Sequence, residues 1–228
     1  MKRISEILLI ASTKFEVNQI IEFFSLMKES NNNLKSYKYK NLNVDVLISG
    51  IGIPSTTYLL TKILLKKEYD LAINVGICGS FNKSIKVGDV VNVVEDEFAD
   101  IGITEANNNF TSLFDEGFIK ENEFPFINRK LISNFSGNLI SLKEVKGITV
   151  NSTSGNYEQI KMRKAKFNAD VETMEGAAVA YVCLIENVKF IQIRAISNPV
   201  EPRNKDNWNI PMAIKNLTNS VVKILQNL

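Results

Sequence analysis

The segment DVETMEGAAVAYVC (170–183) decides the fold. The run 176–184, which extends one residue beyond it, is small or apolar, and this predicts a buried helix with little polar surface. Glu172 and Glu175 stand just before the helix. Carboxylates are stabilised at such a position because the first amides of a helix carry partial positive charge.

The segment KFIQIRAISNPVEPRNKDNW (189–208) follows and predicts a strand. Its β-branched run 190–197 is typical of a parallel strand buried on both faces. Asn198 and Pro199 are predicted to break the strand. Because α/β folds bind ligands at the carboxyl ends of buried parallel strands, Asn198 is a candidate site residue.

The rest of the chain alternates strand and helix patterns. Strands are predicted at 4–11, 44–49, 71–75, 89–95 and 143–150, and helices at 15–24, 54–65, 157–167 and 212–225. Glycine-rich turns are predicted after two of the strands, at 50–52 and 76–79. A long polar excursion is predicted over 107–125. This order predicts one α/β domain over residues 1–228, with a central mixed, mostly parallel, twisted sheet flanked by helices.

Composition narrows the function. A net charge of +2, from 27 basic and 25 acidic residues, favours neither a nucleic-acid nor a membrane partner. Cys78 and Cys183 lie in apolar surroundings, which predicts two buried free thiols in a reducing, cytoplasmic compartment. The chain has no histidine, so histidine metal sites and histidine-based triads are excluded. Carboxylates, lysines or tyrosines are therefore expected to act as the acid or base in any catalysis. No metal or cofactor is expected.

Four strand ends carry polar or glycine-rich residues, near Ser12, Ser49, Val75 and Ser197. They are expected to meet at one edge of the sheet and form a single pocket. Glu16 lies close to the first of them. From the residues alone, its better interpretation is a first-turn acid that interacts with the helix dipole.

Several motifs resemble those of the nucleoside phosphorylase/nucleosidase superfamily. They are the segments 171–178 and 194–198 and the turns 49–52 and 74–80, in the correct order along nearly the whole chain. Within that superfamily, the run 197–204 resembles the futalosine hydrolases in particular. The resemblance implies hydrolysis of futalosine to hypoxanthine and dehypoxanthine futalosine, in the futalosine route to menaquinone. It also implies a homo-oligomer.

The resemblance assigns roles to three residues. Glu175 is expected to accept hydrogen bonds from the ribose 2′ and 3′ hydroxyls, and Met174 to pack near the sugar. Glu16 corresponds to the glutamate that orients the attacking water, so the resemblance favours a general base over a purely structural acid. Glu172 is expected to be structural, either paired or capping.

Two departures from the superfamily narrow the reaction. Hexameric phosphorylases carry an arginine for phosphate where this chain has Asn74, which favours water as the nucleophile. Adenine-cleaving nucleosidases carry an aspartate where this chain has Asn198. An asparagine amide donates two hydrogens, which suit the N7 and 6-oxo acceptors of hypoxanthine. The alternative for Asn198 is a turn residue before Pro199.

Gly79, Ser80 and Tyr157 are further candidates for substrate binding. Ser80 and Ser197 could each hydrogen-bond either a ligand or the backbone. Tyr157 could stack on the purine or on the far side of the substrate, or it could be an exposed aromatic at a helix start.

Three residues are candidates for the aromatic 5′ substituent, which ends in a benzoate. Phe98 and Trp208 would form its walls, with core packing and an oligomer contact as their respective alternatives. Arg203 would pair with the carboxylate, or else with a surface acid, Glu201 or Asp206.

Three rival functions stay open. The first is a nucleosidase acting on 5′-methylthioadenosine, S-adenosylhomocysteine or 6-amino-6-deoxyfutalosine. Asn198 disfavours this function. The second is a non-catalytic nucleoside-binding protein of the same fold, disfavoured by the retained Glu16 and Glu175. A purine nucleoside phosphorylase is the third, disfavoured by Asn74.

Overall fold

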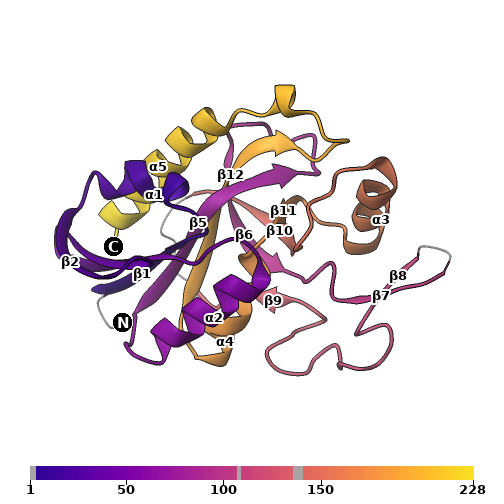
Figure 1. The fold of residues 1–228 in the computed structure, drawn as a ribbon, viewed down its shortest axis with the longest axis horizontal. Coiled ribbons are helices and arrows are strands. Elements are labelled where there is room, and N and C mark those ends of the chain that lie inside the picture. The colour runs from indigo at the N-terminus through magenta and orange to yellow at the C-terminus, as the bar shows by residue number, and fades with distance from the viewer. Residues whose placement is uncertain (1–3, 107–108, 136–140) are drawn as a thin grey trace.

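A mixed, twisted sheet runs through the molecule, with helices on both faces (Figure 1). The computed structural model describes residues 4–106, 109–135 and 141–228. Within these ranges the sheet has ten strands in the spatial order β11-β10-β6-β12-β5-β1-β4-β3-β2, with β9 beside β6. The strands are β1 (Glu6–Ala11), β2 (Ser25–Asn31), β3 (Leu34–Tyr39), β4 (Leu42–Ile48), β5 (Leu71–Ser80), β6 (Val90–Asp96), β9 (Leu131–Ile132), β10 (Lys143–Thr149), β11 (Val171–Thr173) and β12 (Phe190–Pro199). A separate two-stranded sheet pairs β7 (Gly102–Thr104) with β8 (Phe110–Ser112).

The central strands β1, β5 and β12 pair in parallel, and each is largely apolar and buried on both faces. β4 joins β1 in parallel, whereas β6 runs antiparallel to β12. At the far edge β11 pairs with both β10 and β5, so the sheet curls back on itself there. The predicted α/β class and mixed sheet are confirmed, with the parallel pairings concentrated around β1, β5 and β12.

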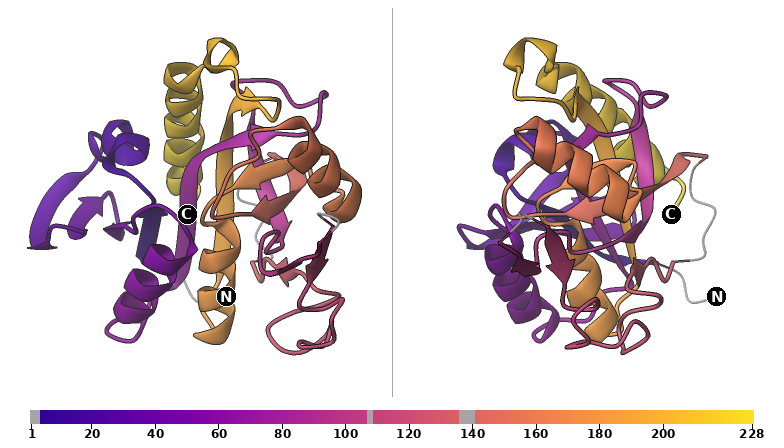
Figure 2. Two further views of the ribbon diagram at one scale, coloured as in Figure 1. Left: turned by 45° about the vertical axis from the view of Figure 1, so that its right-hand side comes forward. Right: turned by 90° about the vertical axis from the view of Figure 1, so that its right-hand side faces the viewer.

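The helices form two covering layers. They are α1 (Lys14–Ile21), α2 (Ile53–Leu64), α3 (Tyr157–Phe167), α4 (Gly176–Ile185) and α5 (Ile210–Gln226), with a short 3-10 helix η1 (Lys205–Asn207) before the last. In the views of Figures 1 and 2, α1 and α5 lie over one face of the sheet and α2 and α4 over the other. Strand β1 shows the division, because Ile7 and Leu9 pack toward the first layer and Leu8 and Ile10 toward the second.

One element was missed and two predictions about local structure were wrong. The hairpin of β2 and β3 was not predicted, although the predicted polar loop at 31–33 overlaps its turn. The glycine-rich segment 76–79 is part of the long strand β5 rather than a turn. The strand β12 does not break at Asn198 but continues through Pro199. The excursion predicted over 107–125 begins outside the described residues, and its described part contains β8.

Candidate active site

A cavity of about 130 Å³ lies at the carboxyl ends of β5 and β12. Four residues predicted for the site line it together, namely Gly79, Asn198, Arg203 and Trp208. They meet because β5 and β12 are paired in parallel and both end at this edge. Within the described residues, Arg203 forms no ion pair with either of the two acids considered for it.

Asn198 is held by its neighbours in the chain. Its Oδ1 accepts a hydrogen bond from Ser197 Oγ at 2.7 Å, and its Nδ2 donates to the Pro199 carbonyl at 2.8 Å. Ser197 Oγ also lies 3.2 Å from the Cys78 carbonyl, so this serine bonds protein groups. An amide nitrogen carries two hydrogens, which leaves one on Asn198 for a ligand in the cavity.

Glu16 is 6% exposed and is fixed on both carboxylate oxygens. Its Oε2 accepts from Ser12 Oγ at 2.6 Å and from the Thr13 amide and hydroxyl at 3.0 Å. Its Oε1 accepts from the Ile77 amide of β5 at 3.2 Å. The bond to the Thr13 amide makes Glu16 part of a capping box that starts α1. The predicted interaction with the helix start is therefore present, and the second oxygen reaches into the sheet.

Arg194 also lies in this region and was not predicted as a site residue. It lies in the middle of β12, is 2% exposed, and its Nε and Nη2 have no hydrogen-bond partner within the described residues. A Cβ atom built on Gly76 would lie 2.3 Å from Arg194 Nη1 and 2.7 Å from Glu16 Oε1. The guanidinium and the carboxylate thus both border the space over Gly76, without a direct ion pair among the described residues. Buried donors without partners are rare in native proteins, so they point to a ligand or water at this position.

Glu175 stands at the start of α4 and is 8% exposed. Its Oε1 accepts a hydrogen bond from the Gly52 amide at 2.9 Å. Burial raises the pKa of Glu175, while the charge of Arg194 and the Gly52 amide act to lower it. Gly52 has φ +88°, a conformation that favours glycine, so the turn before α2 can bring its amide to the carboxylate. Met174, next in the chain, is partly exposed.

The other predicted residues do not line this cavity, except Glu172, and several of them contact the protein itself. The Phe98 ring packs 6.3 Å from the Tyr181 ring of α4, in agreement with the core alternative. Tyr157 is the first residue of α3 and is 66% exposed. Ser80 Oγ donates to the Asn82 carbonyl at 3.0 Å. Glu172 is paired with a buried arginine, as the structural interpretation predicted.

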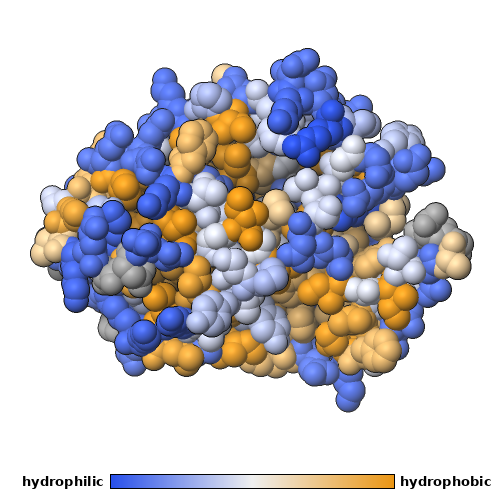
Figure 3. Space-filling model, viewed as in Figure 1, coloured by the Kyte–Doolittle hydropathy of each residue, from blue (hydrophilic) through white to orange (hydrophobic). Residues whose placement is uncertain are grey.

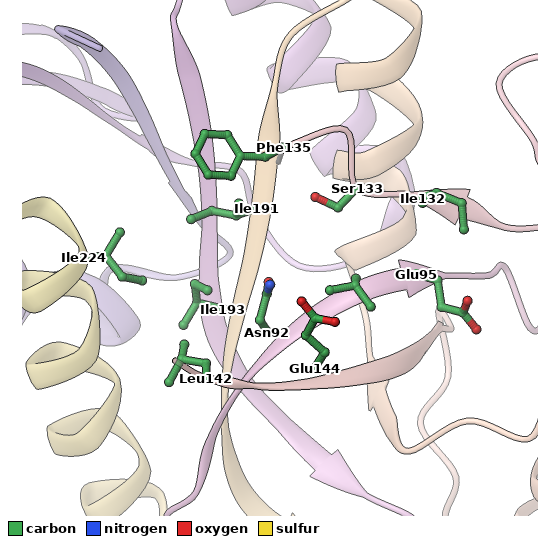
Figure 4. Close-up of a pocket in the computed structure, with 11 residues that line it drawn as sticks. Asn92, Glu95, Ile132, Ser133, Phe135, Leu142, Glu144, Ile191, Ile193 and Ile224 are labelled. Carbon is green, nitrogen blue, oxygen red and sulfur yellow. The ribbon is translucent and has the colours of Figure 1, made fainter. Parts of the chain in front are cut away.

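A second cavity, of about 290 Å³, lies near the amino end of β12 (Figure 4). Asn92 and Glu144 lie near Ile191 and Ile193 in this cavity. None of the residues predicted for the site lines it. The candidate active site therefore remains the carboxyl edge of the sheet.

Two expectations about composition can be compared with the fold. Cys78 and Cys183 are free and buried, as predicted, and burial raises the pKa of Cys78 to about 12. Across the described ranges, no helix combines the length and the apolar character needed to cross a membrane.

Comparison with known proteins shows the family to which this chain belongs. The family model of the phosphorylase superfamily matches residues 6–226, and the chain belongs to that superfamily. It is 29% identical over 185 residues to a futalosine hydrolase of Thermus thermophilus, covering 78% of this chain and 80% of the relative. It is 28% identical over 219 residues to a 5′-methylthioadenosine/S-adenosylhomocysteine nucleosidase of Buchnera aphidicola, covering 93% and 92%. The structure of futalosine hydrolase of Helicobacter pylori matches with a TM-score of 0.81 at 20% identity, covering 99% of each chain.

Proposed function

We propose that this protein hydrolyses the N-glycosidic bond of a purine nucleoside, with futalosine as substrate and hypoxanthine as the released base. The observation that carries the proposal is one edge of the sheet that holds both a carboxylate–arginine cluster and a cavity with a neutral amide, Asn198. The likeness to futalosine hydrolases and to methylthioadenosine nucleosidases supports the reaction class.

Glu175 would bind the ribose. Cleavage of the glycosidic bond builds positive charge on the sugar. An ionised carboxylate that accepts hydrogen bonds from the sugar hydroxyls therefore binds the sugar more strongly as that charge grows. The Gly52 amide occupies one acceptor position on Oε1 and fixes the side chain, so the other acceptor positions remain for the sugar. The charge of Arg194 favours the ionised form of Glu175 at neutral pH.

Glu16 and Arg194 would position the attacking water. The unpaired donors of Arg194 can hold the water oxygen, and Glu16 can take its proton as general base. The hydrogen bonds from Ser12, Thr13 and Ile77 keep the carboxylate in place before the reaction. Asn74, the residue found where the phosphorylases have arginine, is 2% exposed and neutral, so it offers no charge for phosphate. This supports water as the nucleophile.

Asn198 supports hypoxanthine as the base. Its free N–H can donate to N7 or to the 6-oxo oxygen, both of which are acceptors. Arg203 and Trp208 line the same cavity and would contact the substrate beyond the base, with Arg203 available to a carboxylate. Phe98 packs on Tyr181 and Tyr157 is exposed at the start of α3, and neither lines this cavity.

A homo-oligomer is part of the proposal. Tyr58 and Leu65 are exposed seven residues apart, which puts them on one side of α2, and the exposed Ile51 lies just before this helix. Apolar side chains also gather at the lower right of the face in Figure 3, where Figure 1 shows the loop after β8. Exposed apolar patches of this kind mark protein interfaces. Tyr58→Asp should reduce the mass measured by light scattering, and an unchanged mass would place the interface elsewhere.

A nucleosidase for methylthioadenosine and S-adenosylhomocysteine is the second candidate. It is favoured by the 28% identity to such an enzyme over 93% of this chain. The deciding experiment measures base release by the purified protein, without phosphate, from futalosine and from methylthioadenosine in parallel. Hypoxanthine release with little adenine would support the first proposal, and adenine release alone would support the second. No release from either, with or without phosphate, would point to a binding protein.

A further inference from the structure

Gly79 stands between two polar residues of the base cavity. On one side it pairs with Glu172 of β11, and on the other with Asn198 of β12. Residues paired across neighbouring strands present their side chains to the same face of a sheet. Strands are about 4.8 Å apart, so Glu172 and Asn198 stand about 10 Å apart, with a residue lacking a side chain between them. All three line the same cavity.

The space over Gly79 exists because this residue is glycine. A Cβ atom there would lie 3.2 Å from Asn198 Nδ2 and 2.8 Å from Val200 Cγ2. The second distance is shorter than real Cβ contacts, so any side chain would push into the neighbours that border the cavity. The hollow is therefore bounded by a carboxylate on one side and an amide on the other.

Glu172 is buried but is not saturated with hydrogen bonds. Its Oε2 accepts from Ser154 Oγ at 2.5 Å and from Arg163 Nη1 at 3.0 Å, and the two charged side chains are almost wholly buried. Among the described residues, its Oε1 accepts one hydrogen bond, from the Ser154 amide at 2.7 Å. A carboxylate oxygen has two acceptor positions, so Oε1 keeps one. The ion pair with Arg163 fixes the orientation of the Glu172 carboxylate.

The acceptor position on Glu172 and the N–H of Asn198 match the hydrogen-bonding edge of one class of purine. A 6-oxopurine presents a donor at N1–H and acceptors at O6 and N7, whereas adenine presents an acceptor at N1 and a donor at its 6-amino group. We propose that Glu172 Oε1 accepts the N1–H proton of a 6-oxopurine seated over Gly79, while Asn198 donates to O6 or N7. Adenine would turn the lone pair of its N1 toward the carboxylate. Glu172 is then a specificity-determining residue as well as a structural one.

This inference rests on the proposed function, and its test is separable because it measures binding of free bases rather than turnover. The wild-type protein is titrated calorimetrically with hypoxanthine, 1-methylhypoxanthine and adenine. Hypoxanthine should bind about 10- to 100-fold more tightly than either of the others, the range expected for one hydrogen bond to a charged group. Equal affinity for hypoxanthine and 1-methylhypoxanthine would overturn the inference, even if futalosine is hydrolysed.

A variant separates base contact from support of the fold. Arg163→Met combined with Glu172→Met removes the buried pair together, which avoids leaving a lone buried charge. The readout is the ratio of hypoxanthine to adenine affinity, which should fall toward one. A purely structural role would weaken both bases alike and leave the ratio unchanged, which would overturn the inference. Glu144→Gln, at a carboxylate of the separate cavity near the amino end of β12, is the control and should keep the wild-type ratio. If the double variant does not fold, the wild-type titrations decide.

Discussion

Gly76→Ala should disable the water-positioning pair while leaving every polar side chain of the site in the chain. Strand β5 passes beneath Glu16 and Arg194 at this residue. The added Cβ would lie 2.3 Å from Arg194 Nη1 and 2.7 Å from Glu16 Oε1, and real Cβ atoms essentially never come closer than 3.0 Å. The guanidinium would have to retreat by about 0.7 Å and the carboxylate by about 0.3 Å.

Displacements of this size set the expected loss. A misplacement of about 1 Å can cost about 10²-fold in rate, and a general base contributes about 10²–10⁴-fold. We therefore expect kcat of Gly76→Ala to fall about 10²-fold. Overpacking should also destabilise the fold by about 1–3 kcal/mol, with a melting temperature lower by about 2–4 °C for each kcal/mol.

The assay is base release followed by chromatography, at a temperature where circular dichroism shows both proteins folded. Gly147→Ala is the matched control, because its Cβ would lie 2.8 Å from Val93 Cγ1 and 3.1 Å from Asp96 Oδ2. That variant is also overpacked, though by less, and Gly147 lies on β10, which pairs with β6 and β11 rather than with β5 or β12. If the two variants lose the same small fraction of kcat, the assignment of Glu16 and Arg194 to the water is refuted.

Three further predictions follow from the same contacts. Glu16→Gln should lower kcat by about 10²–10⁴-fold with little change in KM, and a kcat equal to that of the wild type would exclude a general base. Asn198→Asp should raise the ratio of adenine to hypoxanthine release when paired nucleosides compete, because a protonated aspartate can both donate to N7 and accept from a 6-amino group. Burial raises the pKa of Asp96 from 3.8 to about 6, so the folded protein holds this proton more tightly than the unfolded chain and loses stability as pH rises from about 4 to about 6. Asp96→Asn removes that loss, and its stability relative to the wild type in urea unfolding should grow by on the order of 3 kcal/mol across this window, whereas a constant difference would contradict the burial argument.

Local signals were sufficient where an element carries its own boundary. The helix predicted at 157–167 agrees with α3, which Asn156 caps by accepting from the Gln159 amide at 2.9 Å. Asn168 ends it in the left-handed conformation, with φ 47°. The buried strands were predicted for a similar reason, because continuous apolar runs have few alternatives in a parallel sheet.

Elements that form only by pairing with a neighbouring strand could not be predicted from the local sequence. The strands β2 and β3 are polar along much of their length and lie at the edge of the sheet, so they become strands by pairing beside β4. The glycines of β5 were interpreted as a turn, although side chains from α1, from β12 and from the residue after β12 occupy the space above Gly76 and Gly79. Such crowding is visible only once the sheet is assembled.

Some site residues could be predicted from local sequence and others could not. Asn198, Gly79, Arg203 and Trp208 were predicted and share one cavity. Arg194 was given no role, yet an arginine inside a run of β-branched residues is itself a signal, since charged side chains are rarely buried without a function or a partner. The register that sets Glu172 opposite Asn198 depends on β11 pairing with β5, which no local pattern reveals.

The parallel arrangement of the central strands also affects the order in which a folding chain acquires activity. The water-positioning pair joins α1, near the start of the chain, to β12, near its end, and the two approach only after β1, β5 and β12 have aligned. Closing such long chain loops costs entropy before any contact repays it, so these pairings belong to the slow part of folding. A refolding chain would therefore regain helical signal well before it regains turnover, and recovered activity would report completion of the central sheet.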